Sequence, residues 1–281
     1  MAYVLFDIGG TKTRVAISQD LRSFSDALKF DTPADFTEGV AAIHEAIASL
    51  TADPIEGMGG GMRGVLNADK TAIVRDPTGT LNAWVEQPLA YALGRPYNTS
   101  VFLENDTATV GLGEAHYGAG KGEEIVVYHT VSTGVGGVKI EAGQIDRSTV
   151  GFEPGHQILD IDGSIFDDGT PHTLENLVSG SALERRRGVK PYEIPQTDPV
   201  WPELASYLAR GLRNSIMYWS PNIIVLGGSM IVGDPRIMLS DIKRETVRLI
   251  EGIVPCPKIV DATLADEGGL YGAMVLIEQR M

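Results

Sequence analysis

The chain has 281 residues, 43% of them hydrophobic, and a formal net charge of −14 at pH 7. A chain of this size can bury a core and suits two domains, and its negative charge argues against a nucleic-acid backbone as partner. The single cysteine, Cys256, excludes an internal disulfide. The sequence shows neither a signal peptide nor a run of about eighteen apolar residues, so we expect a cytoplasmic protein without a membrane anchor.

The first predicted element is a hairpin over Tyr3 to Ile17, YVLFDIGGTKTRVAI. An apolar run reaches Asp7, turns at Gly9-Gly10 and resumes as a second β-rich run. Consecutive glycines let backbone N–H groups approach an anion, and Thr11 and Lys12 add a hydroxyl and a cation, so the turn is a candidate phosphate cradle. Asp7 is a candidate to hold Mg²⁺ through a water molecule. The alternative is an ordinary hairpin with a solvated Asp and Lys.

Between this hairpin and residue 115 the sequence predicts helices, strands and one glycine-rich loop. Val40, Ile43 and Ile47 recur at helical spacing in a helix over 38–50. The stretch 57–64, GMGGGMRG, is expected to be a loop, and its formal dinucleotide fingerprint is rejected because no helix follows it. The further expected elements are strands at 71–74 and 101–103 and helices at 87–93 and 107–115.

A second hairpin is predicted over Val126 to Ile140, VVYHTVSTGVGGVKI, with Thr133 and Gly134 in its turn. Two such turns in two halves of the chain indicate a duplicated fold, whose halves face each other across a cleft and each offer a glycine turn to one phosphate chain. A third glycine pair, Gly227-Gly228, follows a strand-like segment and could pass close to a nucleobase. The remaining elements are a polar loop at 160–173 and helices at 174–183, 201–219, 235–252 and 270–279.

Five segments of the chain resemble known motifs. DIGGTK, STGVGG and IIVLGG, in this order, resemble the two phosphate motifs and the adenosine motif of the sugar-kinase, Hsp70 and actin superfamily. LENDTATVGLGEAHYGAG at 103–120 and FEPGH at 152–156 narrow the resemblance to the ROK family of bacterial sugar kinases and related repressors. The resemblance covers nearly the whole chain.

The resemblance implies an α/β protein with a two-domain actin-like (ribonuclease H-like) ATPase fold and a cleft between its lobes. The smaller lobe is expected over 1–103, with the C-terminal helix 268–281 packed on it. The larger lobe, 104–267, is expected to carry the sugar and adenosine sites. A homodimer is also implied. Because the phosphate hairpin begins at residue 3, we expect no DNA-binding segment of the kind that the repressors carry.

The resemblance also implies roles for individual residues. Asp106 matches the general base toward a sugar hydroxyl, and Asn105 matches a residue that binds a neighbouring hydroxyl. The structural alternative for Asp106 is a helix N-cap. The other residues expected to bind the sugar are Asn82, Glu153, His156, Glu175 and Arg63. The residues expected to bind ATP are Asp7, Gly9, Gly10, Thr11, Lys12, Thr133, Gly134, Gly227 and Gly228.

The loop after FEPGH departs from the family pattern. Many members hold zinc there with cysteines and the histidine, but GSIFDDGTPH at 163–172 contains no cysteine. A Cys₃His site is therefore impossible, and we expect no structural zinc. Asp167, Asp168 and His172 stay open as ligands of another metal, and a solvated polar loop is the alternative.

The sequence thus predicts an enzyme that uses Mg²⁺ and ATP to phosphorylate a hexose, with the 6-hydroxyl of glucose as the first expectation. Fructose, an N-acetylhexosamine and N-acetylmannosamine stay open, because Met62-Arg63-Gly64 replaces the glycine-proline turn that the family places over the sugar. The alternative of a different class is a catalytically silent sugar sensor. Asp7, Asp106 and both glycine turns argue against it, because a binder needs no base beside a phosphate cradle.

Overall fold

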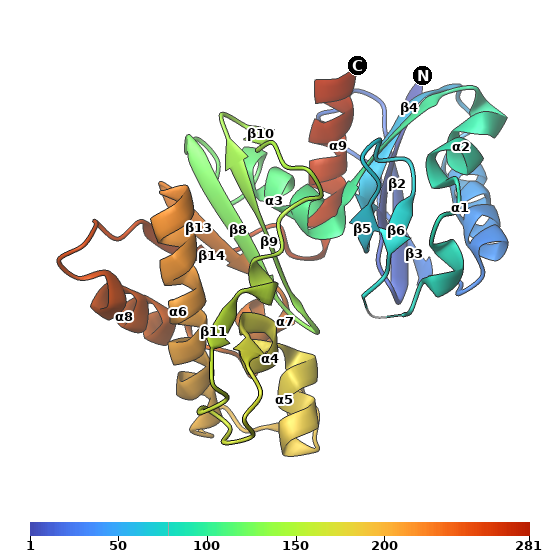
Figure 1. Cartoon of the computed structure of the whole chain (residues 1–281). Helices are drawn as coiled ribbons and strands as arrows, with labels where there is room; N and C mark the ends of the chain where they lie inside the picture. Colours follow the sequence, from blue (N-terminus) through green and yellow to red (C-terminus); the bar gives the residue numbers. More distant parts are fainter. Residues whose placement is uncertain (78) are drawn as a thin grey trace. The chain divides into compact units, whose positions relative to one another are not determined.

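The computed structural model describes residues 1–77 and 79–281, which form two compact units (Figure 1). Unit 1 comprises Met1–Tyr117, Arg147–Gly151 and Asp266–Met281, and unit 2 comprises Gly118–Asp146 and Phe152–Ala265. The expected boundary after residue 103 therefore lies inside unit 1. Each unit is built on its own five-stranded sheet.

The sheet of unit 1 has the strand order β3-β2-β1-β4-β7. Strand β1 (Ala2–Ile8) pairs antiparallel with β2 (Lys12–Ser18), which confirms the first predicted hairpin. On its other side β1 pairs parallel with β4 (Ile55–Met62), which pairs parallel with β7 (Ser100–Asn105). The carboxyl ends of β1, β4 and β7 therefore lie at the same edge of this sheet.

Side chains of β1 alternate between two apolar layers. One layer contains Val4, Phe6 and Ile8, which pack with Ile43 and Ile47 of helix α1 (Phe36–Leu50). Leu5 faces the other layer and packs with residues of helix α9 (Gly268–Arg280), which Figure 1 shows in red beside the sheet. This period-two pattern of burial is what a strand covered on both faces requires.

Helix α3 (Asp106–His116) belongs to unit 1 because it packs closely on α9. A Cβ added at Gly113 would lie 2.4 Å from the backbone oxygen of Gly268, and one at Gly272 would lie 1.7 Å from that of Thr109. The two helices thus approach each other backbone to backbone, which only glycine permits at these positions.

The stretch 57–64 is mostly strand, so the expectation of a loop is wrong. Strand β4 pairs on both sides, and its neighbours leave no room for side chains. A Cβ at Gly59 would lie 2.6 Å from Ile277, and one at Gly60 would lie 2.0 Å from the backbone oxygen of Phe6. Pairing and close packing therefore override the low β-propensity of glycine.

Unit 2 repeats this architecture in the order β10-β9-β8-β13-β14. Strands β8 (Ile125–Val131) and β9 (Val135–Glu141) form the second predicted hairpin. Strand β8 also pairs parallel with β13 (Ile223–Gly227), which pairs parallel with β14 (Lys258–Asp261). Because both sheets combine a hairpin with two parallel strands in the same order, the structure confirms the predicted duplication.

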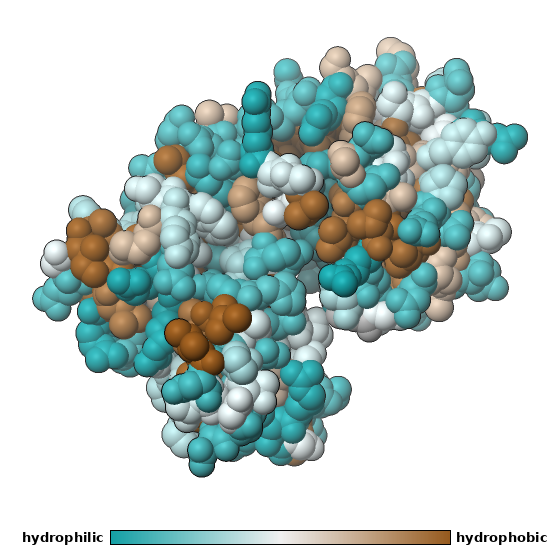
Figure 2. Space-filling model, viewed as in Figure 1, coloured by the Kyte–Doolittle hydropathy of each residue, from teal (hydrophilic) through white to brown (hydrophobic). Residues whose placement is uncertain are grey.

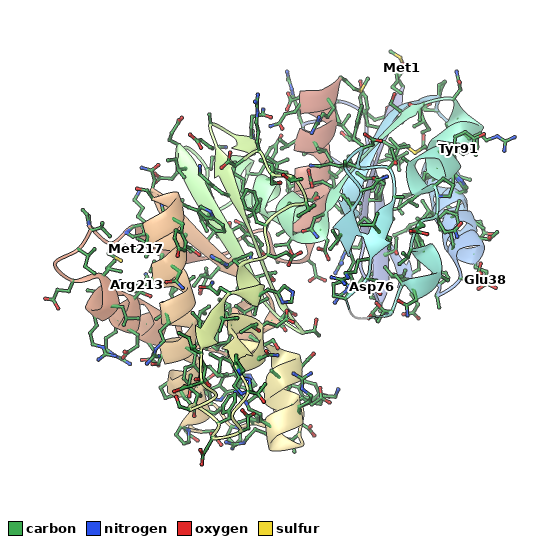
Figure 3. All side chains as sticks on the ribbon, viewed as in Figure 1. Met1, Glu38, Asp76, Tyr91, Arg213 and Met217 are labelled. Atoms are coloured by element: carbon green, nitrogen blue, oxygen red, sulfur yellow. The ribbon has the colours of Figure 1, made fainter. Side chains whose placement is uncertain are left out.

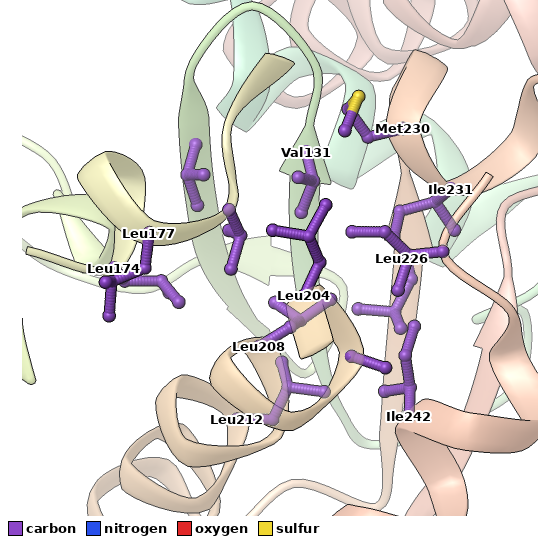
Figure 4. Close-up of a cluster of buried hydrophobic side chains, with 14 of the residues drawn as sticks. Val131, Leu174, Leu177, Leu204, Leu208, Leu212, Leu226, Met230, Ile231 and Ile242 are labelled. Carbon is purple, nitrogen blue, oxygen red and sulfur yellow. The ribbon is translucent and has the colours of Figure 1, made fainter. Parts of the chain in front are cut away.

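The core of unit 2 lies between its sheet and helices α6 (Val200–Trp219) and α8 (Leu239–Ile250). Figure 4 shows Leu204, Leu208 and Leu212 of α6 beside Leu226 of β13, and all four side chains are fully buried. Removing this apolar area from water is the main source of stability for such a layer.

The helix expected at 174–183 is divided into α4 (Leu174–Val178) and α5 (Gly180–Arg187). Ser179 separates them, because its hydroxyl caps α5 by accepting the N–H of Ala182 at 3.2 Å. The other strands and α-helices are β3 (Leu28–Asp31), β5 (Val65–Leu66), β6 (Ile73–Arg75), α2 (Leu89–Gly94), β10 (Gln144–Ile145), β11 (Ile158–Asp160), β12 (His172–Thr173) and α7 (Ser229–Val232).

Hydrophilic residues cover much of the face drawn in Figure 2, and hydrophobic residues appear there in separate groups. Among the helices of the described residues, none combines the length and the hydropathy that crossing a membrane demands.

We expect Gly60→Ala to lower the free energy of unfolding by about 2–3 kcal/mol, because the new methyl group would overlap the backbone of Phe6. Urea unfolding monitored by circular dichroism measures the change. Glu56→Ala, at an exposed position of the same strand, is the matched control and should change stability by less than about 0.5 kcal/mol. Equal effects of the two substitutions would contradict this account of β4.

Candidate functional site

In unit 1 the candidate site begins with two carboxylates at the end of the parallel strands. Asp7 of β1 is in register with Gly61 of β4, and Asp106 follows β7 as the first residue of α3. A Cβ at Gly61 would lie 3.0 Å from the Cα of Asp106. Glycine there lets the start of α3 approach the strand. The carboxyl ends of parallel strands are the usual place for ligand-binding residues in α/β folds.

Asn105, and not Asp106, is the N-cap of α3. Its side-chain oxygen accepts the N–H of Ala108 at 3.2 Å, and its side-chain amide donates to the backbone oxygen of Gly64 at 3.2 Å. One amide hydrogen of Asn105 therefore remains for a ligand hydroxyl. Asp106 is free of the capping role, and its Oδ1 accepts the N–H of Thr107 at 2.7 Å.

The environment of both carboxylates favours their protonated forms. Burial raises the pKa of Asp106, while the N–H of Thr107 and the charge of Arg63 oppose the change. Burial also raises the pKa of Asp7 to about 6, and the negative charge of Asp106 adds to this effect. Two carboxyl groups with raised pKa values at one sheet edge are typical of functional sites.

Arg14 and Asp266, to which no sequence motif points, extend this cluster. Arg14 lies opposite Asp7 in the hairpin, and its Nη1 is 3.3 Å from Oδ2 of Asp7. Its Nη2 is 2.6 Å from Oδ2 of Asp266, which also binds Lys29 at 3.0 Å. Hairpin register could have identified Arg14, because it and Asp7 are equally far from the turn. Asp266 is brought in only by the docking of the C-terminal segment.

Asp7 fits a role toward Mg²⁺, which prefers one or two carboxylates together with waters and phosphates. Its side chain is 16% exposed, so one face of it can meet a ligand. In the described part of the chain, no group of three or more His, Cys, Asp or Glu residues could hold a metal by itself. A metal at Asp7 would therefore depend on ligands that the substrate and water supply.

The first glycine turn is closed by the N–H of Gly9, which donates to the backbone oxygen of Lys12 at 3.0 Å. The hydroxyl of Thr32 donates to the backbone oxygen of Gly9 at 2.8 Å and ties the turn to the neighbouring segment. The side chain of Lys12 forms an exposed ion pair with Asp31, and Thr11 is exposed. The structure therefore directs Lys12 to strand β3.

Arg63 follows β4 and lies against the glycine turn. A Cβ at Gly10 would lie 3.1 Å from Cδ of Arg63 and 2.5 Å from the hydroxyl oxygen of Thr80. The Nε of Arg63 is 3.9 Å from Oδ1 of Asp76, whose side chain is fully buried and accepts the N–H of Leu81 at 2.6 Å. Figure 3 labels Asp76 among the strands of unit 1.

Asn82 is exposed and begins a 3-10 helix, Asn82–Trp84, that follows this segment. A Cβ at Gly79 would lie 3.3 Å from Nδ2 of Asn82. Gly79 has a φ of +73°, a left-handed conformation that glycine adopts without strain. The turn thus leaves the amide of Asn82 at the surface of unit 1, where it can bind a ligand.

In unit 2 the turn at Ser132–Gly134 is held by three other segments. Oε2 of Glu175, from α4, accepts the N–H of Val135 at 2.8 Å. The N–H of Gly180, from α5, donates to the backbone oxygen of Ser132 at 2.7 Å. A 3-10 helix, Pro154–His156, also packs on the hairpin, because a Cβ at its Gly155 would lie 2.1 Å from the backbone oxygen of Val135.

These contacts bring predicted sugar and nucleotide residues of unit 2 into one region. Glu175 supports the turn that contains Thr133 and Gly134, and it would meet a Cβ at Gly134 at 2.7 Å. Glu153 precedes the 3-10 helix and His156 ends it, with Oε2 of Glu153 and Nε2 of His156 3.9 Å apart and side chains 48% and 54% exposed. Both are therefore accessible to a ligand.

The third glycine pair packs against the same hairpin. Gly228 has a φ of +88°, and a Cβ there would lie 2.4 Å from the backbone oxygen of Val131. A Cβ at Gly227 would lie 2.3 Å from the hydroxyl oxygen of Tyr128. The hydroxyls of Ser132 and Ser229 are 3.0 Å apart and join the two turns. Glycine is thus required here by packing within unit 2.

The loop at 160–173 contains polar pairs. His172 lies 3.0 Å from Asp168, and the ring of Phe166 meets the ring of His172 edge-on, with centroids 4.8 Å apart. The side chain of Asp160 is buried and accepts the N–H of Ile165 at 3.1 Å. These contacts between side chains and backbone of the loop hold it together.

Residues 3–280 match the model of the ROK family. The chain belongs to the ROK family. It is 26% identical to a fructokinase of Pediococcus pentosaceus over 97% of this chain and 96% of that protein.

Two solved structures are similar over the full length of this ROK protein. A ROK hexokinase from Thermus thermophilus has a TM-score of 0.85 and 28% identity, over 100% of this chain and 99% of that one. A ROK family glucokinase from Streptomyces griseus, solved in complex with glucose and AMPPNP, has a TM-score of 0.80 and 25% identity, over 99% and 100% of the two chains. The expected actin-like α/β fold is thereby confirmed.

The raised pKa of Asp7 predicts a pH-dependent cost to stability. Its folded-state pKa of about 6 exceeds the ordinary 3.8, so the stability that the protonated form contributes is complete below pH 3.8 and is lost as the pH rises through about 6. With chelator present at pH 7.5, we expect Asp7→Asn to be more stable than the parent by about 1–3 kcal/mol in urea unfolding.

The difference in unfolding free energy between Asp7→Asn and the parent should be smaller when the same measurement is made at pH 4.5. Asp69→Asn is the control, because Asp69 is an exposed residue outside the cluster, and it should leave stability unchanged at both pH values. A gap that is larger at pH 4.5 than at pH 7.5 would show that burial does not disfavour the Asp7 carboxylate.

Proposed function

We propose that the chain is an ATP-dependent sugar kinase that transfers the γ-phosphoryl group to a hexose hydroxyl, with Asp106 as the general base. The observation that carries the proposal is the placement of Asp7 of β1 and Asp106, which follows β7, at the same edge of the sheet, on either side of β4 and near the Gly9-Gly10 turn. Membership of the ROK family and similarity to proteins named fructokinase and glucokinase support the same class of reaction.

The environment of Asp106 suits proton abstraction from a hydroxyl group. The bond from Thr107 holds Oδ1 and leaves Oδ2 to accept the proton. Burial raises the pKa of this carboxyl group, which makes the carboxylate a stronger base than a solvated one. Because Asn105 caps the helix, the orientation of Asp106 does not depend on a capping bond of its own.

For ATP we assign the phosphates to Gly9, Gly10 and Thr11 in unit 1 and to Thr133 and Gly134 in unit 2. Mg²⁺, when bound, neutralises phosphate charge, and Asp7 would hold it through water. Lys12 stays in this set with its ion pair to Asp31 as a competing contact. The adenosine moiety is assigned to Gly227 and Gly228.

For the sugar we assign Asn82 and Asn105 in unit 1 and Glu153, His156 and Glu175 in unit 2. Carboxylates and amides suit this ligand because they form paired hydrogen bonds with vicinal hydroxyls. Glu175 would offer Oε1, since its Oε2 supports the turn. Glucose, through its 6-hydroxyl, is our first substrate, and fructose and N-acetylated hexosamines are the alternatives. We further propose a homodimer in the cytoplasm, without structural zinc.

A screen of ADP release across hexoses and N-acetylhexosamines identifies the substrate. With the best sugar, we expect Asp106→Asn to lower kcat about 10²- to 10⁴-fold, because the variant cannot accept the proton. The dissociation constant of the sugar and the melting temperature should stay close to those of the parent, since Asn keeps the shape and Asn105 keeps the cap. Steady-state kinetics measure kcat, and calorimetry measures the dissociation constant and the melting temperature.

Asp69→Asn controls for the loss of one exposed carboxylate and should be fully active. An Asp106→Asn enzyme within a few-fold of the parent would disprove the role of Asp106. A parent protein that binds a sugar but releases no ADP with any of them would instead support the sugar-sensing alternative.

A further inference from the structure

We propose that Arg63 is a catalytic residue that contacts and neutralises the phosphoryl group during its transfer. The proposal rests on the proposed kinase function and changes the role of Arg63 from sugar recognition to stabilisation of the transition state. It is argued from two contacts and one electrostatic relation, all of them within unit 1.

The first contact places the stem of Arg63 against the phosphate turn. Glycine at position 10 leaves space for the side chains of Thr80 and Arg63, since a Cβ there would come within 2.5 Å of the Thr80 hydroxyl oxygen and 3.1 Å of Cδ of Arg63. The backbone N–H of Arg63 also donates to the oxygen of Ile8 at 2.9 Å. These two contacts fix the start of the side chain beside the turn that we assign to ATP.

The second contact orients the guanidinium group. Asp76 lies 3.9 Å from Nε of Arg63, and its side chain is fully buried. The N–H of Leu81 binds Oδ2 of Asp76 at 2.6 Å, so this carboxylate is itself held in place. The charge of a buried and positioned carboxylate draws the guanidinium group toward one conformation, which lowers the reorganisation needed during reaction.

The third relation is electrostatic and reaches the base. Arg63 lies close enough to Asp106 for its charge to lower the pKa of that carboxyl group. In phosphoryl transfer the moving group lies in line between the donor phosphates and the attacking hydroxyl. An arginine whose stem touches the phosphate turn and whose charge acts on the base therefore lies beside this path.

The side chain of Arg63 is 27% exposed, so its guanidinium group can meet a ligand. Arginine suits a phosphoryl group better than a sugar hydroxyl, because its planar fork matches two phosphate oxygens and it always carries a charge. Stabilisation of this kind requires that the charge be placed before the reaction begins. Asp76, which is held by the N–H of Leu81 and is paired with Arg63, supports that placement.

The test compares Arg63→Gln and Arg63→Lys with Arg75→Gln, which removes an exposed arginine from strand β6. Steady-state kinetics give kcat and the KM for the best sugar. Calorimetry gives the affinity for ADP alone and for ADP with aluminium fluoride and sugar, which imitates the transferring phosphoryl group. Melting temperatures establish that each variant is folded.

For Arg63→Gln we expect kcat to fall about 10²- to 10³-fold, as when one preorganised donor is removed. The KM for the sugar and the affinity for ADP alone should change by less than a few-fold. Affinity for the fluoroaluminate complex should fall together with kcat. Arg63→Lys keeps the charge but not the fork, so its loss should be intermediate, and Arg75→Gln should match the parent.

A raised KM for the sugar with unchanged kcat would overturn the proposal and return Arg63 to sugar recognition. Equal losses of affinity for ADP and for its fluoroaluminate complex would overturn it as well. If Arg63→Gln does not fold, Arg63→Lys decides, because full activity of that variant excludes a requirement for the fork. A parent without ADP release would refute the kinase function itself, which is a separate result.

Discussion

The candidate site of unit 1 depends on backbone packing that only glycine allows. Gly59 and Gly60 let β4 lie tightly between its neighbours, and Gly61 lets the start of α3 come within contact of the strand. Gly113 and Gly272 then bring α3 and α9 together backbone to backbone. Without these approaches Asp106 could not lie near Asp7, because ordinary side chains would hold the helix and the strand apart.

This arrangement buries charge at a cost to stability. Asp7 and Asp106 repel each other and are both partly withdrawn from water, so each is harder to ionise than a solvated aspartate. Arg14 and Arg63 offset part of that cost, one beside each carboxylate. Sites that hold unfavourable charge before a ligand arrives commonly trade stability for function. A cationic ligand or a transferred proton would reduce the repulsion between the two carboxylates.

In unit 2 the second hairpin is likewise held in place by hydrogen bonds and close packing with other segments. The hairpin donates a hydrogen bond to Glu175 of α4 and accepts one from Gly180 of α5. The FEPGH segment and the third glycine pair pack closely against it. Residues that match the sugar-binding positions of the family thus also support the turn that matches its phosphate motif. Glu175 is the clearest case, because one of its oxygens is bound to Val135. On the proposed assignments, substitution of Glu175 would affect both sugar binding and phosphate binding.

The sequence by itself determined both glycine hairpins, most helices and the duplicated sheet pattern, because strand periodicity and turn residues are local signals. Asp7 was singled out by its place at a strand end, and Asp106 by its resemblance to the family motif. The sequence also determined the family. Only the tertiary structure decided that 57–64 is a strand, since a run of glycines has no side-chain pattern and is stabilised by its neighbours. Pairing across strands decided the partners of Lys12 and Asp7. Packing of α3 on α9 decided the unit boundary, and the φ and ψ angles at the start of α3 made Asn105 the cap. These features depend on residues far apart in sequence or on one precise backbone turn, which residue types alone do not encode.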